Sequence, residues 1–170
     1  FKKAEIVSFT RDLLETFEQQ TRVKKLDLKF HTSAPEIEMW IDPKNFDKII
    51  LNLLSNACKF TPENGQVEIS LSTGEDTHLP QNAPLRRYVE LTVADSGIGI
   101  ASTEREHIFE RFYQIRNSQN NSNIGTGIGL HLTRSLVELH YGNIHVEDNG
   151  EGRPGSRFII RLPLGNGHLK

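Results

Sequence analysis

The sequence predicts an α+β fold in one domain, and two observations carry that prediction. Apolar residues recur every three or four positions in some stretches, as on one face of a helix, and alternate with polar residues in others, as in a strand. The chain of 170 residues is 36% hydrophobic and 25% charged, which suits a single globular domain with a real core.

The helical pattern appears in four stretches. Asp42 suits an N-cap and Pro43 suits a first helical position, so that start is well defined, and Gly142 is a plausible C-cap. The expected helices run from Lys2 to about Gln20, from Pro43 to about Phe60, onward from Ser102 or Thr103, and from Gly125 to about Tyr141.

Alternating or β-rich runs bounded by turn residues predict the strands. Two of them, on either side of a polar loop that spans residues 74–86, are expected to pair with each other. The predicted strands are Lys25–Thr32, Glu36–Ile41, Val67–Leu71, Arg87–Ala94, Asn143–Glu147 and Ser156–Leu164.

Charge and composition exclude several classes of protein. The net charge of −2 gives no electrostatic case for a nucleic-acid partner. Cys58 is the only cysteine, which rules out an internal disulfide and suggests a reducing compartment. No apolar run reaches the length of a membrane span and no signal peptide is visible. The chain starts at Phe1, so we expect it to be part of a longer protein.

A polar stripe lies beside the apolar face of the helix predicted from Pro43. Asn52, Asn56 and Lys59 are four and three residues apart, so their side chains stack on one side of the helix. Asparagine is a poor helix former, and two in mid-helix need a reason. Two amide oxygens and an ammonium group could hold a metal ion and the phosphates that it neutralises, whereas the alternative is an ordinary solvated helix face.

Two glycine clusters are consistent with close approach of backbone to a ligand, and the alternative for each is an ordinary turn. Gly97 and Gly99 follow Asp95 at the end of a strand, while Gly125, Gly127 and Gly129 lead into a helix N-terminus, which is a natural anion site. The spacing is neither that of the Rossmann fingerprint nor that of a P-loop. Between the clusters, residues 114–123 are nearly all Asn, Gln and Ser, so we expect this segment to be mobile.

Four motifs in order resemble the catalytic ATP-binding domain of bacterial sensor histidine kinases. They are Asn-x-x-x-Asn-x-x-Lys-Phe-Thr-Pro, Asp-x-Gly-x-Gly-Ile, Ile-Phe-Glu-Arg-Phe and Gly-Thr-Gly-Ile-Gly-Leu, similar to the family's N, G1, F and G2 boxes. The resemblance covers residues 1–164, with 165–170 expected to begin a C-terminal linker. It implies a two-layer α/β sandwich, the Bergerat ATP-binding fold, with helices on one face of a mixed, mostly antiparallel sheet.

The resemblance also implies the site residues. Asn56 would ligate Mg²⁺, with Asn52 beside it and Lys59 on a phosphate oxygen; Asp95 would accept a hydrogen bond from the adenine amino group. A lid of residues 113–124 would close over ATP and become ordered with it, with Arg116 as a candidate contact to the γ-phosphate. The remaining implied contacts to the nucleotide or to the lid are Phe60, Gly97, Gly99, Ile100, Phe109, Phe112, Gly125, Thr126, Gly127, Gly129 and Leu130.

The resemblance leaves three functions open. The first is transfer of the ATP γ-phosphoryl group to a protein histidine. The second is ATP hydrolysis of the gyrase, Hsp90 and MutL kind; those enzymes carry a water-activating glutamate where this chain has Asn52, and an amide is a poor base. The third is an interaction module that has lost nucleotide binding, which the intact motifs disfavour.

None of the seven histidines has the flanking sequence of a family phosphoacceptor. The implied partners are therefore a dimerising, phosphoacceptor helical hairpin before Phe1 and, later in the pathway, the receiver domain of a response regulator. The isolated domain is expected to be a monomer without direct membrane contact, on the cytoplasmic side of a membrane-anchored bacterial sensor.

Overall fold

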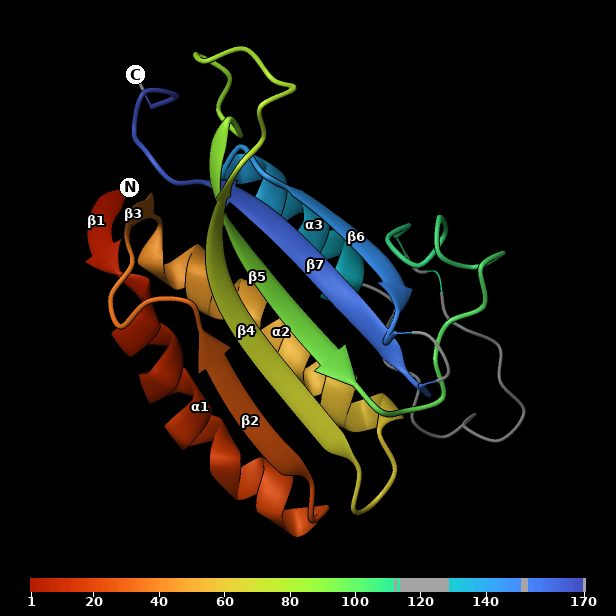
Figure 1. The fold of residues 1–170 in the computed structure, drawn as a ribbon. Coiled ribbons are helices and arrows are strands. Elements are labelled where there is room, and N and C mark those ends of the chain that lie inside the picture. Colours follow the sequence, from red (N-terminus) through yellow and green to blue (C-terminus); the bar gives the residue numbers. More distant parts are fainter. Residues whose placement is uncertain (112, 114–128, 151–152, 170) are drawn as a thin grey trace.

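The structure is a computed structural model and describes residues 1–111, 113, 129–150 and 153–169 (Figure 1). Its helices are α1 (Ile6–Val23), α2 (Pro43–Phe60) and α3 (Gly129–Leu139). Its strands are β1 (Lys2–Glu5), β2 (Asp27–Thr32), β3 (Glu38–Ile41), β4 (Gln66–Glu75), β5 (Arg87–Asp95), β6 (Asn143–Asp148) and β7 (Ser156–Pro163).

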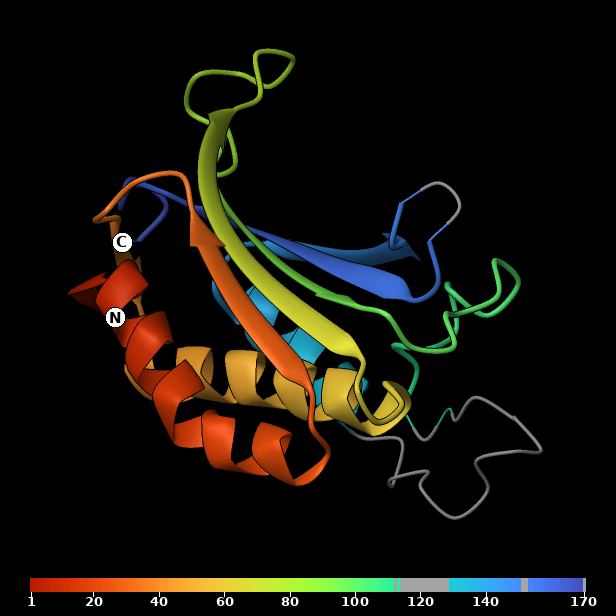
Figure 2. The ribbon, with the colours of Figure 1, turned by 60° about the horizontal axis from the view of Figure 1, so that its bottom comes forward.

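The main sheet has five strands in the order β2-β4-β5-β7-β6. Only β2 and β4 pair in parallel; β4 with β5, β5 with β7 and β6 with β7 are antiparallel. The three described helices cover one face of this sheet (Figure 2). This arrangement confirms the predicted α+β sandwich with a mixed, mostly antiparallel sheet.

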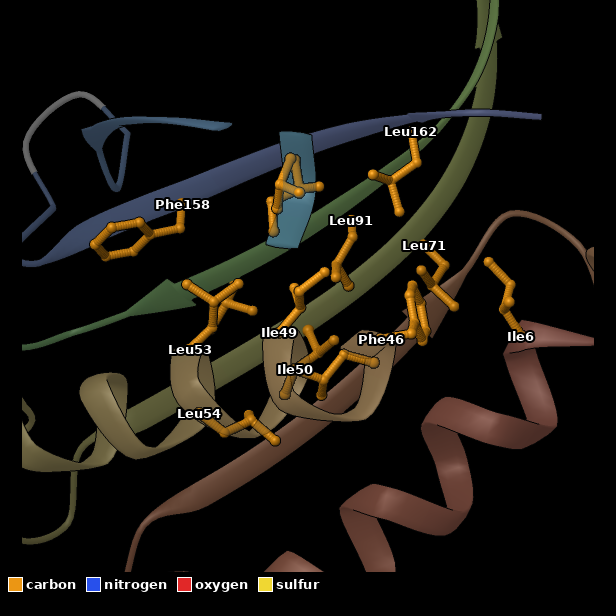
Figure 3. Packing of buried hydrophobic residues seen from close by; sticks show 14 of the residues in the cluster. Ile6, Phe46, Ile49, Ile50, Leu53, Leu54, Leu71, Leu91, Phe158 and Leu162 are labelled. Carbon is orange, nitrogen blue, oxygen red and sulfur yellow. The ribbon is translucent and has the colours of Figure 1, made fainter. Parts of the chain in front are cut away.

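The core lies between this face and α2. Leu53 and Ile49 point from α2 toward Phe158 and Leu91 of the sheet, and all four side chains are buried (Figure 3). The strands that form this face show the alternation that their sequences predict, with every second residue of β4 buried from Val67 to Leu71. The apolar stripe of α2 therefore fixes the rotation of the helix, which leaves its polar stripe outside the core.

The predicted helical start at Lys2 is wrong. Residues Lys2–Glu5 form a strand antiparallel to Glu38–Ile41, and α1 begins only at Ile6. The Glu5 carboxylate accepts hydrogen bonds from the backbone N–H groups of Val7, Ser8 and Ile37. Although burial opposes it, these bonds lower the pKa of Glu5 to about 2. Glu5 is thus an N-cap that also fastens β1 to the loop before β3.

The helix predicted from Ser102 or Thr103 is also wrong, because residues 102–111 form successive turns. Most of their backbone bonds span three residues, such as Glu104 N–H to Ala101 O and His107 N–H to Glu104 O. A tertiary contact takes over a carbonyl that the predicted helix would use, since Phe109 O accepts from Nδ1 of His131, and just before this segment Ile100 O accepts from Nε of Arg105.

A buried histidine joins the start of α2 to the end of α3. His140 is 2% exposed; its Nδ1 donates to Leu136 O at 2.8 Å and its Nε2 accepts from Asp42 N–H at 3.1 Å. Because Nε2 accepts this bond, the ring is neutral, and burial lowers the pKa of His140, which favours the same form. After α3, Tyr141 rather than Gly142 takes the left-handed backbone, with φ of 64°. Gly142 is needed for another reason, since a Cβ there would lie 2.2 Å from Arg161 O.

No helix in the described ranges is long and apolar enough to cross a bilayer.

Candidate functional site

The C-terminal half of α2, the end of β5 and the start of α3 meet at one end of the molecule (Figure 1). The turn after β5 packs on the last residue of α2, because a Cβ at Gly97 would lie 2.2 Å from Phe60 O. The side chain of Asn52 in α2 donates to that of Thr133 in α3 at 3.3 Å. The structure therefore brings together the predicted residues of α2, of the segment 95–100 and of the start of α3.

The polar stripe of α2 is only partly buried, and its outer members are unengaged. Among the residues that the structure describes, the side chains of Asn56 and Lys59 have no hydrogen-bond or ion-pair partner, and neither does Oδ1 of Asn52. Partial burial lowers the pKa of Lys59 from its usual value. Two amide oxygens and an ammonium group are thus available to a ligand, as the sequence pattern predicts.

Asp95 is a buried carboxylate without a cationic partner among the residues that the structure describes. It is 2% exposed and accepts hydrogen bonds from Gly97 N–H at 3.0 Å and from the Ser156 hydroxyl at 3.0 Å. Burial raises the pKa of Asp95, and these hydrogen bonds offset that effect only in part. A carboxylate held in this way is a directed acceptor rather than half of an ion pair.

Glycines let other backbone segments approach Asp95. Gly99 has a φ of +77° and Gly155 a φ of +104°, which side chains disfavour. A Cβ at Gly155 would lie 1.7 Å from Asp95 O, so the hairpin between β6 and β7 can reach this carbonyl only with glycine at 155. Asn149 of the same hairpin donates to Asp95 O at 2.8 Å.

The remaining described residues that the sequence pointed to surround this centre. Phe109 is buried, and its ring is edge-on to that of Phe158 with 6.2 Å between the ring centroids. Phe60 and Ile100 are half-buried. Leu130 is half-buried in the first turn of α3. A Cβ at Gly129 would meet no described atom within 4 Å, so packing among these residues does not require glycine there.

Several predicted residues lie outside the described part of the chain. These are Phe112, Arg116, Gly125, Thr126 and Gly127, together with the expected lid apart from Tyr113. Tyr113 itself donates from its hydroxyl to Glu104 at 3.0 Å.

Four residues that sequence reasoning missed support the site. The Thr133 hydroxyl accepts from the Asn52 side chain, and the Ser156 hydroxyl donates to the Asp95 carboxylate. Asn149 donates to the backbone carbonyl of Asp95, and Lys24 donates to Cys58 O at 2.6 Å in the last turn of α2. Thr133 left the clearest signal, since it is a polar residue among the apolar positions of α3. Cys58 is half-buried, and burial raises the pKa of its thiol to about 11, so it is not a reactive thiolate.

The donor set fits a magnesium ion that arrives with phosphates. No group of three or more His, Cys, Asp or Glu side chains within the described residues could hold a metal by itself. Mg²⁺ commonly takes one or two protein oxygens and completes its shell with water and substrate phosphates. The free amide of Asn56 can supply such an oxygen.

Comparison with known proteins agrees with this geometry. Residues 41–166 match the family described as Histidine kinase-, DNA gyrase B-, and HSP90-like ATPase. The chain is 36% identical over 164 residues to the sensor histidine kinase TmoS of Ectopseudomonas mendocina, covering 96% of this chain and 16% of TmoS. It is 32% identical over 154 residues to the histidine-protein kinase/phosphatase MprB of Mycolicibacterium paratuberculosis, covering 89% of this chain and 27% of MprB.

Solved structures show the same fold. A mycobacterial sensor histidine kinase MprB superposes with a TM-score of 0.73 at 26% identity, covering 95% of this chain and 96% of that one. The catalytic domain of the histidine kinase ThkA has a TM-score of 0.78 at 24% identity, with 97% and 96% covered. The chain therefore belongs to the family of histidine kinase-, DNA gyrase B- and HSP90-like ATPases, and these relatives are all histidine kinases.

Proposed function

We propose that this chain binds Mg-ATP and donates the γ-phosphoryl group to a histidine on a separate dimerisation domain of its parent, a sensor kinase of two-component signalling. The observation that carries the proposal is the amide stripe of α2, where Asn56 and Oδ1 of Asn52 have no partner among the described residues, at the end of the molecule that also holds the buried acceptor Asp95. The relatives named above support it, since they are sensor histidine kinases.

Each residue in the proposal has a distinct role. The carboxylate of Asp95 accepts from the amino group of adenine, and its position against Gly97 and Ser156 fixes the base. Lys59 contacts a phosphate oxygen, and Asn52 and Asn56 place their amide oxygens beside the triphosphate. Asn56 would hold the Mg²⁺ ion, which would supply positive charge to neutralise the phosphates. Phosphoryl transfer needs little more from a protein than positioning and neutralisation of charge.

The same proposal includes residues on either side of the described start of α3. Arg116 contacts the γ-phosphate, Phe109 and Phe112 anchor the lid, and Phe60 and Ile100 line the base and ribose. The glycine-rich segment closes over the phosphates through Gly125, Thr126, Gly127, Gly129 and Leu130. The open space at Gly129 supports this role, because a ligand rather than packing then accounts for glycine there.

Hydrolysis of the gyrase kind is less well supported. Asn52 stands at the position where those ATPases carry a general base, and its amide already donates to Thr133. An amide does not accept a proton at neutral pH, so water at this position would not be activated.

The partners follow from the same reaction. We propose a phosphoacceptor hairpin preceding Phe1, a receiver domain that takes the phosphoryl group next, and a cytoplasmic location in a membrane-anchored parent. We place the catalytic unit at residues 1–164 and the start of a linker at 165–170. A solved complex of ThkA with the response regulator TrrA supports the second partner; this chain covers 43% of ThkA there at 24% identity.

Incubation with γ-labelled ATP tests the proposal. The chain alone should acquire no acid-labile, base-stable label, whereas addition of the parent's hairpin in trans should give label on the hairpin, weakly, because tethering normally supplies the local concentration. Label on the isolated chain would show that the acceptor has been misassigned. Steady phosphate release without label on either chain would instead support the gyrase-type reaction.

A further inference from the structure

A short relay of hydrogen bonds connects the backbone of α3 to the site face of α2. The Thr133 hydroxyl donates to Gly129 O at 2.7 Å, and Nδ2 of Asn52 donates to the same hydroxyl oxygen at 3.3 Å. Thr133 is fully buried. The relay lies where the first turn of α3 packs on α2, and its central hydroxyl is buried while Asn52 is half-buried and Gly129 is exposed.

The proton count in this relay sets the orientation of the Asn52 amide. A hydroxyl has one proton, and that of Thr133 is engaged by Gly129 O, so the oxygen can only accept from Asn52. The amide must therefore present its NH₂ group to Thr133. A flipped amide would place its oxygen against the hydroxyl oxygen, acceptor against acceptor. Oδ1 of Asn52 then points away from α3 and has no partner among the described residues.

We propose that Thr133 is a positioning residue that holds Asn52 with its amide oxygen toward the phosphates and their metal ion. This inference rests on the proposed function. It adds that α3, directly after the glycine-rich segment, determines whether the Asn52 amide presents its oxygen or its NH₂ group to the ligand. Without the hydroxyl, the Asn52 amide can rotate and present NH₂ instead of oxygen to the ligand.

A purely structural role for Thr133 has different consequences. Thr133 would then fill space between α2 and α3, and its replacement would lower stability or weaken every nucleotide equally. The positioning role affects only ligands that meet the Asn52 oxygen, which are the phosphates with Mg²⁺. Thr133→Val keeps the shape and removes the hydroxyl, whereas Thr133→Ser keeps the hydroxyl and loses a methyl group.

Calorimetry with a non-hydrolysable ATP analogue in Mg²⁺, and with ADP in EDTA, separates the two roles. Thr133→Val should weaken the Mg-analogue about three- to tenfold, the range for one neutral hydrogen bond. Its affinity for metal-free ADP should stay within about twofold, and Thr133→Ser should resemble the wild type. In an Asn52→Ala background, Thr133→Val should cause no further loss.

Thr10→Val is the matched control. Thr10 is also fully buried, but it lies on α1 and its hydroxyl has no partner among the residues described, so this change should leave both affinities intact. Thermal unfolding checks that each variant folds, with Thr133→Ala as the replacement if Thr133→Val does not.

Three outcomes would overturn the positioning role: unchanged Mg-analogue affinity in Thr133→Val, an equal loss for metal-free ADP, or a loss in Thr133→Ser as large as in Thr133→Val. A wild-type chain that binds no nucleotide would contradict the proposed function instead, and with it the basis of this inference.

Discussion

The two ends of α2 differ in how their polar groups are satisfied. At the N-terminal end, Asp42 N–H donates to His140, and the Asp42 carboxylate accepts from Asn45 at 3.0 Å. Oδ1 of Asp47 is the exception there, buried without a partner among the described residues. At the C-terminal end, Asn56, Lys59 and the buried Asp95 have no charged partner within the described chain, and the side chains of Asn56 and Lys59 make no hydrogen bond there. Both ends belong to one helix with one continuous buried face.

This difference separates groups that serve folding from groups that await a ligand. Polar groups that bond one another inside the protein offset their own loss of water, whereas unengaged ones do so only when a ligand arrives. Changes at the C-terminal end should therefore alter affinity more than stability, and changes at the N-terminal end should do the opposite. Four substitutions test this contrast.

Asp95→Asn should have the largest effect. Loss of a charged acceptor should weaken ATP about ten- to a hundredfold, and wild-type protein should bind GTP more weakly than ATP by a similar factor. Calorimetry measures both affinities. Equal affinity of the wild type for GTP and ATP would contradict the role of Asp95.

Asp95→Asn should not lower thermal stability, although it lowers the affinity for ATP. Burial raises the pKa of Asp95 in the folded protein, so its contribution to stability is present below the ordinary pKa and is lost as pH rises through the raised pKa. Above the raised pKa the ionised carboxylate is less favourable to folding than the protonated one, so the Tm of Asp95→Asn should equal or exceed that of wild type, and the difference should not shrink as pH rises. A large drop in Tm would place Asp95 among the folding groups.

Asn56→Ala should weaken Mg-ATP about tenfold, because a metal-facing oxygen is lost. Titrations with Mg²⁺ and with EDTA measure this, and the two proteins should bind metal-free nucleotide alike. Asn45→Ala is the matched control, because it is the same change on the same helix at a side chain that already bonds Asp42. It should lower the Tm slightly and leave the affinity for Mg-ATP unchanged. Unchanged Mg-ATP affinity in Asn56→Ala would rule out the metal assignment.

Lys24→Met tests whether a group that bonds the C-terminal end of α2 from outside the stripe serves folding or binding. Lys24 donates to Cys58 O and Lys59 O, and its charge offsets the negative end of the α2 dipole. The free energy of unfolding should fall by about 1–2 kcal/mol in urea titrations, and Lys24→Arg should recover part of it. The affinity for ATP should change less than about threefold. A tenfold loss of affinity at full stability would make Lys24 a residue of the site.

His140 should give the smallest effect, visible as a pH dependence. Burial lowers the pKa of His140 in the folded protein, so its contribution to stability is complete above about 6.5, the unfolded value, and is lost as pH falls below it. Urea titrations between pH 7.5 and 5.5 should show a smaller decline in His140→Gln than in wild type. His168→Gln is the necessary control, since the pKa of His168 is lowered as well. Equal declines in wild type and His140→Gln would exclude His140 as the source.

The sequence predicted the parts of the fold whose signals are local. The apolar period of α2, the Asp42-Pro43 start and the alternation in β4 all lie within single elements, and all are present. The strand at Lys2–Glu5 was missed because its partner, Glu38–Ile41, is more than 30 residues away. The turns at 102–111 were mistaken for a helix because their apolar spacing is helical, whereas His131, far along the chain, takes the Phe109 carbonyl that a helix would use.

The candidate site divides in the same way. Asn52, Asn56 and Lys59 are predictable because helical spacing alone brings them together. The partners of Thr133 and Ser156 are not predictable, even though Thr133 stands out as a polar residue in α3, because each acts across a tertiary contact, to α2 and to the end of β5 respectively. The reason for glycine at 97 was also hidden, since it depends on the distance to Phe60 O.

Gly155 has a consequence for how sequence variation in this protein should be interpreted. Its α-hydrogen is the largest group that fits beside the Asp95 carbonyl, so even alanine would push the strand that ends at Asp95. In a screen that ranks variants by nucleotide affinity, substitutions at position 155 would lower affinity as much as substitutions of residues that contact the base. Intolerance to substitution therefore does not show that a residue contacts the nucleotide. A residue in a hairpin loop can be equally intolerant because it packs against a residue of the site.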